Sequence, residues 1–418
     1  MKRLLALTLV VMLAGTSLFA AAAEGAIPMK IATWTSNEGQ IALLTSFVEG
    51  FAKEKGITIN VTFESIPFAE YNTKLLLELQ GNAAPDAFWI LENTAPAFVS
   101  SGLLAQLDAA LANANPEDLA PSAMELWQKD GKTYAVPFST SPFFMVYNAD
   151  LFTEAGAKTP NEYAAQNAWT WDAFREAAKA IKDKTGKWGF MTVDAQGYDS
   201  RILHNLVPMI RSYGADAWTA DGTVLVDAPE SVQAVQLFHD MLFTDGSVVP
   251  PGDESNFFTG DAAMTVCQIS RLSNLKDVTW KWDMAPMPSG PVGQVPVIGQ
   301  AAIGAFANGA HADLAAELVA YMTNEESVAA MAGIWPPARK SVLESEGFLS
   351  SNAAVTPDQM KNVVSASIGT GRVLPTHVNY MQMDAEAKIV YDKLWVKDAD
   401  VAAILKEVAQ VYRNYTGK

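Results

Sequence analysis

Apolar residues in the N-terminal part of the chain repeat with two different periods. Strand-like runs cover 29–34, 57–63 and 86–91. Between them, 36–56 and 71–79 repeat apolar residues at three- and four-residue spacing, which predicts helices with one buried face. The order strand, helix, strand, helix, strand predicts a parallel sheet flanked by helices. On such a sheet, ligands bind beyond the carboxyl ends of the strands.

The middle of the chain contains a strand interrupted by polar residues. The stretch 130–152 begins with a turn and continues as two apolar strands, which are separated by Ser139, Thr140 and Ser141. This polar interruption predicts a crossing between two lobes. Strand-like runs return at 262–269 and 297–306, and the tail from Val401 to Tyr412 has the pattern of an amphipathic helix.

The N-terminus has the pattern of a cleaved secretory signal peptide, which we assign to 1–23. Lys2 and Arg3 precede an apolar run, and small residues of the A-x-A type precede Glu24. A membrane anchor is the alternative. Thr16 stands where a lipoprotein would carry its acylated Cys, so we predict a soluble periplasmic protein. The only cysteine, Cys267, lies in an apolar strand-like run and is predicted to be a buried structural thiol.

The chain is strongly acidic. The 418 residues carry a formal charge of −17, and removing Lys2 and Arg3 with the signal peptide gives −17 − 2 = −19. Nucleic acid and anionic membrane surfaces are therefore poor partners. Half of the residues are hydrophobic, which is sufficient for folded cores, and the length suggests two lobes.

The sequence contains none of the catalytic or metal-binding motifs considered. The four histidines are far apart, and no Walker loop, G-x-S-x-G or G-x-G-x-x-G is present. We therefore predict no catalytic residues, no metal and no cofactor. Because an acidic protein offers many carboxylates, a secreted glycosidase with a carboxylate pair remains the enzyme alternative.

An ordered series of motifs resembles one family along nearly the whole chain. After the export signal come "KIATW", "GITINVTFE", "APDAFWILENTAPAFVSSGLLAQL", "DGKTYAVPFSTSPFFMVYNADLF", "TWDAF", "FFTGDAAMTV" and "PPARKSVLES". Together they resemble the extracellular solute-binding proteins of carbohydrate ABC transporters, a family that includes maltose-binding and glycerol-3-phosphate-binding proteins.

The resemblance implies the type II periplasmic binding protein fold, with two α/β lobes joined by hinge strands. Each lobe is expected to contain a mainly parallel sheet flanked by helices. The N-terminal lobe would comprise 24–139 and 301–338, and the C-terminal lobe 140–300 and 339–418. The resemblance further implies a monomeric protein that is not an enzyme. Such a protein closes on a mono- or oligosaccharide and delivers it to an ABC permease.

The resemblance also suggests which residues bind the ligand. These residues are Trp34, Asn37, Glu38, Glu92, Asn93, Thr94, Thr140, Ser141, Tyr198, Gln300, Trp335 and Arg372. Carboxylates and amides suit sugar hydroxyls because they make several hydrogen bonds at once. Trp34, Tyr198 and Trp335 are the candidate platforms for a sugar ring.

Three further charged residues are considered for structural or phosphate-binding roles. Asp86 precedes its strand, on the side of the sheet away from the expected cleft, and is predicted to be structural. Arg339 and Arg372 are candidate clamps for a glycerol phosphate or sugar phosphate, because Arg binds oxyanions with two donors. A neutral sugar is preferred, since Arg372 does not align with the arginine of the phosphate-binding relatives.

Overall fold

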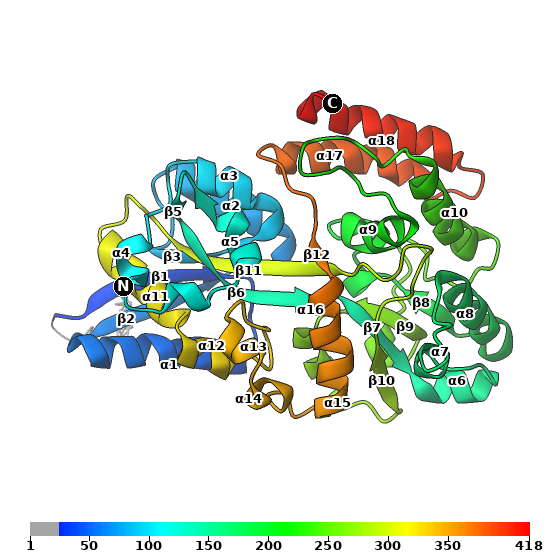
Figure 1. The fold of residues 1–418 in the computed structure, drawn as a ribbon, viewed down its shortest axis with the longest axis horizontal. Coiled ribbons are helices and arrows are strands. Elements are labelled where there is room, and N and C mark those ends of the chain that lie inside the picture. The colour runs from blue at the N-terminus through cyan, green and yellow to red at the C-terminus, as the bar shows by residue number, and fades with distance from the viewer. Residues whose placement is uncertain (1–24) are drawn as a thin grey trace, which may run out of the picture.

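The structure is a computed structural model that describes residues 25–418. The predicted signal peptide lies outside the described residues. Two α/β lobes lie side by side, each with its own sheet and its own helices (Figure 1). The two-lobed α/β architecture predicted from the sequence is therefore confirmed.

The first lobe is built on a six-stranded sheet among the described residues. Its strands are β1 (Ile27–Thr33), β2 (Ile59–Ser65), β3 (Ala87–Leu91), β6 (Ala135–Pro142), β11 (Val297–Ala305) and β12 (Arg372–Val373). As predicted, β1 pairs in parallel with both β2 and β3. The carboxyl ends of these strands therefore lie at one edge of the sheet, which faces the second lobe (Figure 1).

Helices cover both faces of this sheet. They are α1 (Glu38–Lys55), α2 (Phe68–Gln80), α3 (Ala95–Ser100), α4 (Asp108–Leu111), α5 (Pro121–Met124), α11 (Ala312–Met322), α12 (Glu325–Met331), α13 (Lys340–Leu343) and α14 (Glu346–Leu349). The periodic apolar pattern predicted α1 because Leu44, Val48 and Phe51 are buried on one face of this helix. Asn37 accepts a hydrogen bond from the Gln40 N–H at its start, and Gly56 ends it with φ 66°.

The second lobe differs from its prediction. Its strands are β7 (Phe144–Asn148), β8 (Trp188–Met191), β9 (Ala262–Cys267) and β10 (Trp282–Ala285). Only β8 and β9 pair in parallel, whereas β7 pairs antiparallel with both β9 and β10. The expectation of a mainly parallel sheet is wrong here. Because β7 enters directly from the first lobe as the continuation of β6, it is not part of a strand–helix–strand unit.

Helices also surround the second sheet. They are α6 (Ala149–Ala155), α7 (Pro160–Ala164), α8 (Trp171–Thr185), α9 (Ile202–Tyr213), α10 (Pro229–Phe243), α17 (Tyr380–Tyr391) and α18 (Val401–Thr416). The predicted tail helix is confirmed as α18, which buries one face against α17. The short helices α15 (Pro357–Gln359) and α16 (Ala366–Thr370) lie between the lobes (Figure 1). The exact lobe boundaries remain a prediction.

Three segments cross between the lobes. β6 runs into β7 at Phe143, and β11 pairs antiparallel with β6 along most of its length. β12 pairs with the start of β11 and provides the third crossing. The polar stretch 139–141 falls inside β6 at this junction, so the predicted crossing is confirmed.

Three charged or reactive residues have structural roles. Asp86 accepts a hydrogen bond from the Lys30 N–H at 2.8 Å, which ties β3 to β1 as predicted. Cys267 is buried in β9, and burial raises the pKa of its thiol, so the predicted structural role is confirmed. Arg339 is fully buried and donates to the carbonyls of Thr323, Asn115 and Ala114 at 2.6 to 2.8 Å. It therefore joins segments of the first lobe and is not a phosphate clamp.

We expect Arg339→Met to lower the free energy of unfolding by about 3–5 kcal/mol, because it leaves buried carbonyls and Asp118 without their cation. Denaturant titration measures the change. The matched control is Arg413→Met, which breaks the part-exposed pair with Asp227 and should cost less than about 1 kcal/mol. Equal losses in the two variants would contradict the structural role of Arg339.

Candidate ligand-binding cleft

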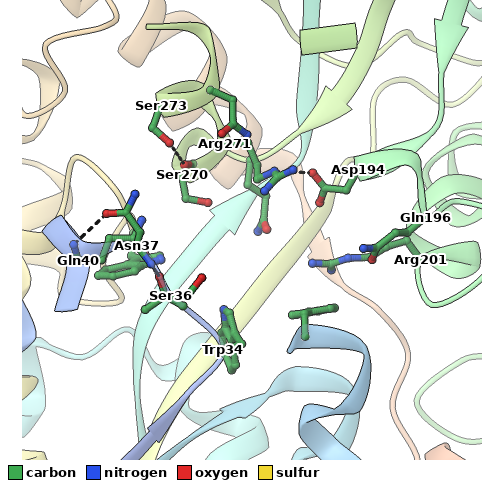
Figure 2. Close-up of a pocket in the computed structure, with 15 residues that line it drawn as sticks. Trp34, Ser36, Asn37, Gln40, Asp194, Gln196, Arg201, Ser270, Arg271 and Ser273 are labelled. Atoms are coloured by element: carbon green, nitrogen blue, oxygen red, sulfur yellow. Dashed lines mark hydrogen bonds and ion pairs between the residues drawn. The ribbon is translucent and has the colours of Figure 1, made fainter. Parts of the chain in front are cut away.

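A cavity of about 440 Å³ lies between the two lobes, and we call it the front cavity (Figure 2). The first lobe lines it with Trp34, Thr35, Ser36, Asn37, Gln40, Phe68 and Trp335, and the second lobe lines it with Asp194, Gln196, Arg201, Gln268, Ser270, Arg271, Ser273 and Asn274. Side chains of both lobes therefore face one space, as a site that closes around a ligand requires.

Two smaller cavities adjoin it and share some of its residues. The floor cavity, of about 60 Å³, lies against the crossing strands and is lined by Glu92, Ser139, Ser141, Gly299 and Gln300 among others. The rear cavity, of about 280 Å³, lies between α2 and α17 and includes Asn93, Thr94 and Asp384. Phe68 and Arg201 line all three cavities.

The first lobe contributes an aromatic wall. Trp34 follows β1 and packs edge-on against Tyr71 and Trp89, with ring centroids 5.1 and 4.6 Å apart. Trp335 also packs edge-on against Trp89, with ring centroids 5.3 Å apart. Because Trp89 is fully buried in β3, it holds both tryptophans at the cavity wall.

The second lobe contributes a polar wall. Asp194 lies in the 3₁₀ helix η4 (Val193–Ala195) with φ 51°, a left-handed conformation that is uncommon outside glycine. Its carboxylate lies 2.7 Å from Arg271 Nε, and Figure 2 shows this pair on one side of the cavity. Gln268 donates from Nε2 to the Ser141 carbonyl at 2.9 Å, which connects this wall to the crossing strand β6.

A buried polar cluster spans the lobes beneath the cavity. Glu92 is only 2% exposed, and its Oε2 accepts a hydrogen bond from the Gln300 N–H at 3.0 Å. Its Oε1 lies 3.5 Å from His204 Nε2, and Arg201 Nη1 lies 3.1 Å from the same nitrogen. Burial lowers the pKa of His204, and the nearby Arg201 cation lowers it further.

Most of the predicted ligand-binding residues line these cavities. Trp34, Asn37 and Trp335 line the front cavity, Glu92, Ser141 and Gln300 the floor cavity, and Asn93 and Thr94 the rear cavity. Ser141 Oγ and Asn93 Oδ1 are buried without a hydrogen-bond partner among the described residues. Thr94 Oγ1 donates to the Leu91 carbonyl, and Gln300 Oε1 accepts from Trp127 Nε1.

Four predicted residues do not line these three cavities. Thr140 Oγ1 donates to the carbonyls of Pro336 and Pro337, so its hydroxyl holds the hinge segment. Tyr198 donates to the Val249 carbonyl at 2.7 Å and packs in the core of the second lobe. Glu38 is exposed in the first turn of α1, and Arg372 is exposed in β12.

The sequence prediction missed the polar wall of the second lobe. Gln196 and Arg201 line the front cavity, whereas Tyr198, the residue between them that the sequence favours, does not. The arginines of the cleft are Arg201 and Arg271, whereas neither Arg339 nor Arg372 lines these cavities. The left-handed backbone conformation at Asp194 and Ala195 could not be predicted from the sequence, because neither residue is a glycine.

The described residues contain no group of three or more His, Cys, Asp or Glu side chains that could hold a metal ion. Within the same part of the chain, no helix has the length and apolar character needed to cross a membrane.

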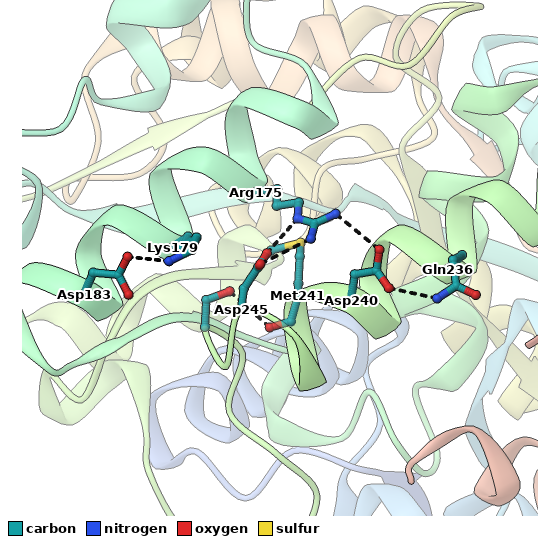
Figure 3. A network of polar contacts seen from close by, with 8 residues as sticks. Arg175, Lys179, Asp183, Gln236, Asp240, Met241 and Asp245 are labelled. Atoms are coloured by element: carbon teal, nitrogen blue, oxygen red, sulfur yellow. Dashed lines mark hydrogen bonds and ion pairs between the residues drawn. The ribbon is translucent and has the colours of Figure 1, made fainter. Parts of the chain in front are cut away.

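A separate groove of about 500 Å³ lies on the second lobe alone, between α8 and α10. Its cation, Arg175, is paired: Nε donates to Asp245 at 2.6 Å and Nη1 to Asp240 at 3.4 Å (Figure 3). Gln236 donates to the other oxygen of Asp240. These polar groups form hydrogen bonds with one another, and all of them lie on one lobe. This groove is therefore a weaker candidate for the ligand-binding site than the front cavity.

Comparisons with known proteins agree with this geometry. Residues 46–357 match the family described as bacterial extracellular solute-binding protein. The arabinooligosaccharide-binding protein of Halalkalibacterium halodurans is 26% identical over 280 residues, which cover 63% of this chain and 60% of that protein. The chain thus spans less than two thirds of this curated relative.

Solved structures show the same fold. An ABC substrate-binding protein of Listeria monocytogenes, solved in complex with cycloalternan, superposes with a TM-score of 0.81 at 22% identity. The alignment covers 94% of this chain and 99% of that one. A maltose-bound protein of T. maritima gives a TM-score of 0.79 at 18% identity, covering 93% and 100%.

The fold and the interlobe cleft thus define a two-lobed binding protein of type II. Because the family match covers more than half of the chain, the protein belongs to the family of bacterial extracellular solute-binding proteins. The resemblance found in the sequence is confirmed.

Asp384 in the rear cavity makes stability depend on pH. Burial raises the pKa of its carboxyl to about 6, and the nearby Asp199 charge adds to this. Because the folded-state pKa lies above the ordinary 3.8, charging Asp384 destabilises the fold. The loss begins as pH rises above about 4 and is complete above about 6.

We expect Asp384→Asn to raise the free energy of unfolding at pH 8 by up to about 3 kcal/mol and to change it little at pH 4. Denaturant titrations at the two pH values measure this difference. Asp392→Asn, which changes an exposed carboxylate after the same helix, should have a small effect at both. An equal gain at pH 4 and pH 8 for Asp384→Asn would contradict the buried charge.

Proposed function

We propose that the protein captures a mono- or oligosaccharide between its lobes and presents it to the permease of an ABC importer. The observation that carries this proposal is the front cavity, which combines an aromatic wall from one lobe with a polar wall from the other. Sugars offer both an apolar C–H face and hydroxyls that donate and accept. The ligands named for similar proteins, arabinooligosaccharides and maltose among them, support the same class.

The binding energy of such a ligand would favour the closed arrangement of the lobes. A ligand that contacts both walls interacts more strongly when the lobes are closed, so it shifts the population toward that state. The crossings at β6, β11 and β12 are the segments about which the lobes would move. We further propose that the protein acts as a soluble monomer in the periplasm.

The carboxylates of the cleft favour binding over hydrolysis. Asp194 is paired with Arg271, and Glu92 is buried and accepts a backbone hydrogen bond from Gln300. A glycosidase needs two carboxyl groups that are free to reach the bond being cleaved. A panel of glycosides separates the two functions: stabilisation without product supports capture, and turnover would refute it.

The aromatic wall can be tested with a sugar that a thermal-shift screen identifies. We expect Trp34→Ala to weaken the binding of that sugar about tenfold, because the sugar ring loses its aromatic contact. Isothermal titration calorimetry measures the affinity. The matched control is Trp395→Ala, which removes a half-buried tryptophan that packs on Tyr198 outside the cleft. The site assignment is wrong if both variants bind as tightly as the original protein.

A further inference from the structure

Arg201 is a buried cation whose hydrogen-bonding capacity is largely unused. It lies just before α9, is 9% exposed and lines all three cavities of the cleft. Nη1 lies 3.1 Å from His204 Nε2, whereas Nε is buried and has no acceptor among the described residues. No carboxylate of the described residues lies within 4.0 Å of its guanidinium, which points into the front cavity (Figure 2).

The other buried arginines of the described chain are all matched by acceptors. Arg339 donates to three carbonyls and lies 3.6 Å from Asp118. Arg211 binds Asp216 at 2.7 Å and also donates to the carbonyls of β12. The part-buried Arg175 is paired with two aspartates. These three arginines therefore have carboxylate partners, and Arg201 differs from them because it lies in the cleft and has none in contact.

The neighbours of Arg201 compensate its charge only in part. The centroid of the Phe68 ring lies 4.2 Å from the guanidinium carbon, a cation–π contact that stabilises the charge in part. His204 supplies a ring nitrogen and no negative charge. The charges of Asp194 and Glu92 act on Arg201 without a direct ion pair, so burial of this cation is only partly offset and the ligand-free site is destabilised at this point.

The carboxylates closest to the cleft are engaged with other groups. Asp194 pairs with Arg271, and Glu92 Oε2 accepts from Gln300. The charged residues that line the front cavity are Asp194, Arg201 and Arg271, which sum to +1 on a chain of formal charge −17. The lining residues of the front cavity alone thus carry a net charge of +1, and the next carboxylate, Glu92, lies in the adjoining floor and rear cavities without contacting Arg201.

We propose that the ligand carries a single carboxylate that binds the guanidinium of Arg201, which makes it an acidic carbohydrate of the hexuronate class. This inference rests on the proposed function and specifies its ligand. A planar carboxylate matches the two parallel donors of a guanidinium edge. One carboxylate balances one unpaired cation, whereas a phosphate group brings up to two negative charges to a site in which Arg271 is already paired.

The first experiment measures thermal stabilisation and calorimetric affinity with matched sugars. Each of glucose, galactose and mannose is compared with its hexuronate and its hexose 6-phosphate, and short oligomers of the hexoses and hexuronates extend the panel. We expect a hexuronate or its oligomer to stabilise the protein more than the neutral and phosphorylated sugars of the same stereochemistry. Stronger binding of a neutral or phosphorylated sugar overturns the inference and leaves the carbohydrate function intact. No stabilisation by any sugar counts against both.

Substitution then tests the role of Arg201 itself. Arg201→Gln should weaken hexuronate binding about 10- to 100-fold, because a charge-assisted hydrogen-bond pair is lost. Arg175→Gln, which removes an arginine outside the cleft, should leave the affinity unchanged. Unchanged hexuronate affinity in Arg201→Gln overturns the assignment.

A measurement without ligand provides an independent test. Arg201→Met removes a buried cation that is only partly compensated, so we expect the melting temperature of the ligand-free protein to rise by about 1–3 °C. Arg339→Met, which removes a fully bonded arginine, should lower it. A comparable fall for both variants would show that Arg201 is satisfied by the protein alone and would overturn the inference whatever sugar binds.

Discussion

The hydrogen bond between Glu92 and the Gln300 N–H joins the parts of the molecule on which the cleft depends. Glu92 follows β3 at the carboxyl end of the first sheet, and Gln300 lies in the crossing strand β11. The same carboxylate faces His204 at the start of α9 in the second lobe. Because a polar side chain that is only 2% exposed needs hydrogen-bond partners within the protein, Glu92 depends on the meeting of these three segments.

This junction places two unlike walls opposite each other. The first lobe presents two tryptophans that are held in place by the buried Trp89, and the second lobe presents amides, hydroxyls and arginines. An apolar face and a polar face separated by one cavity suit a molecule with both kinds of surface. One of the two hydrophobic core clusters, which includes Ile31 of β1 and Ala262 of β9, continues from the first lobe into the second.

Much of the fold could be predicted from the sequence, because the periodic spacing of apolar residues shows which segments form helices and strands with a buried face. The helix from Glu38 and the strand ending at Leu91 follow directly from apolar spacing, and Glu92 was correctly placed at the strand end. The second sheet was harder to predict. The direction of β7 depends on its continuation from β6 across the lobes, which no local pattern contains. The site residues divide in the same way. Trp34 and Glu92 follow strands, whereas Arg201 lies just before α9 and Arg271 lies in the 3₁₀ helix η6 (Ile269–Leu275), and the positions of both depend on tertiary packing.

A crystal structure of the protein with the sugar selected by thermal-shift screening tests the central claim most directly. The account predicts the sugar in the front cavity, in contact with Trp34 or Trp335 on one side and with side chains of the second lobe on the other. A sugar bound in the groove between α8 and α10, with the front cavity free of it, would contradict the account.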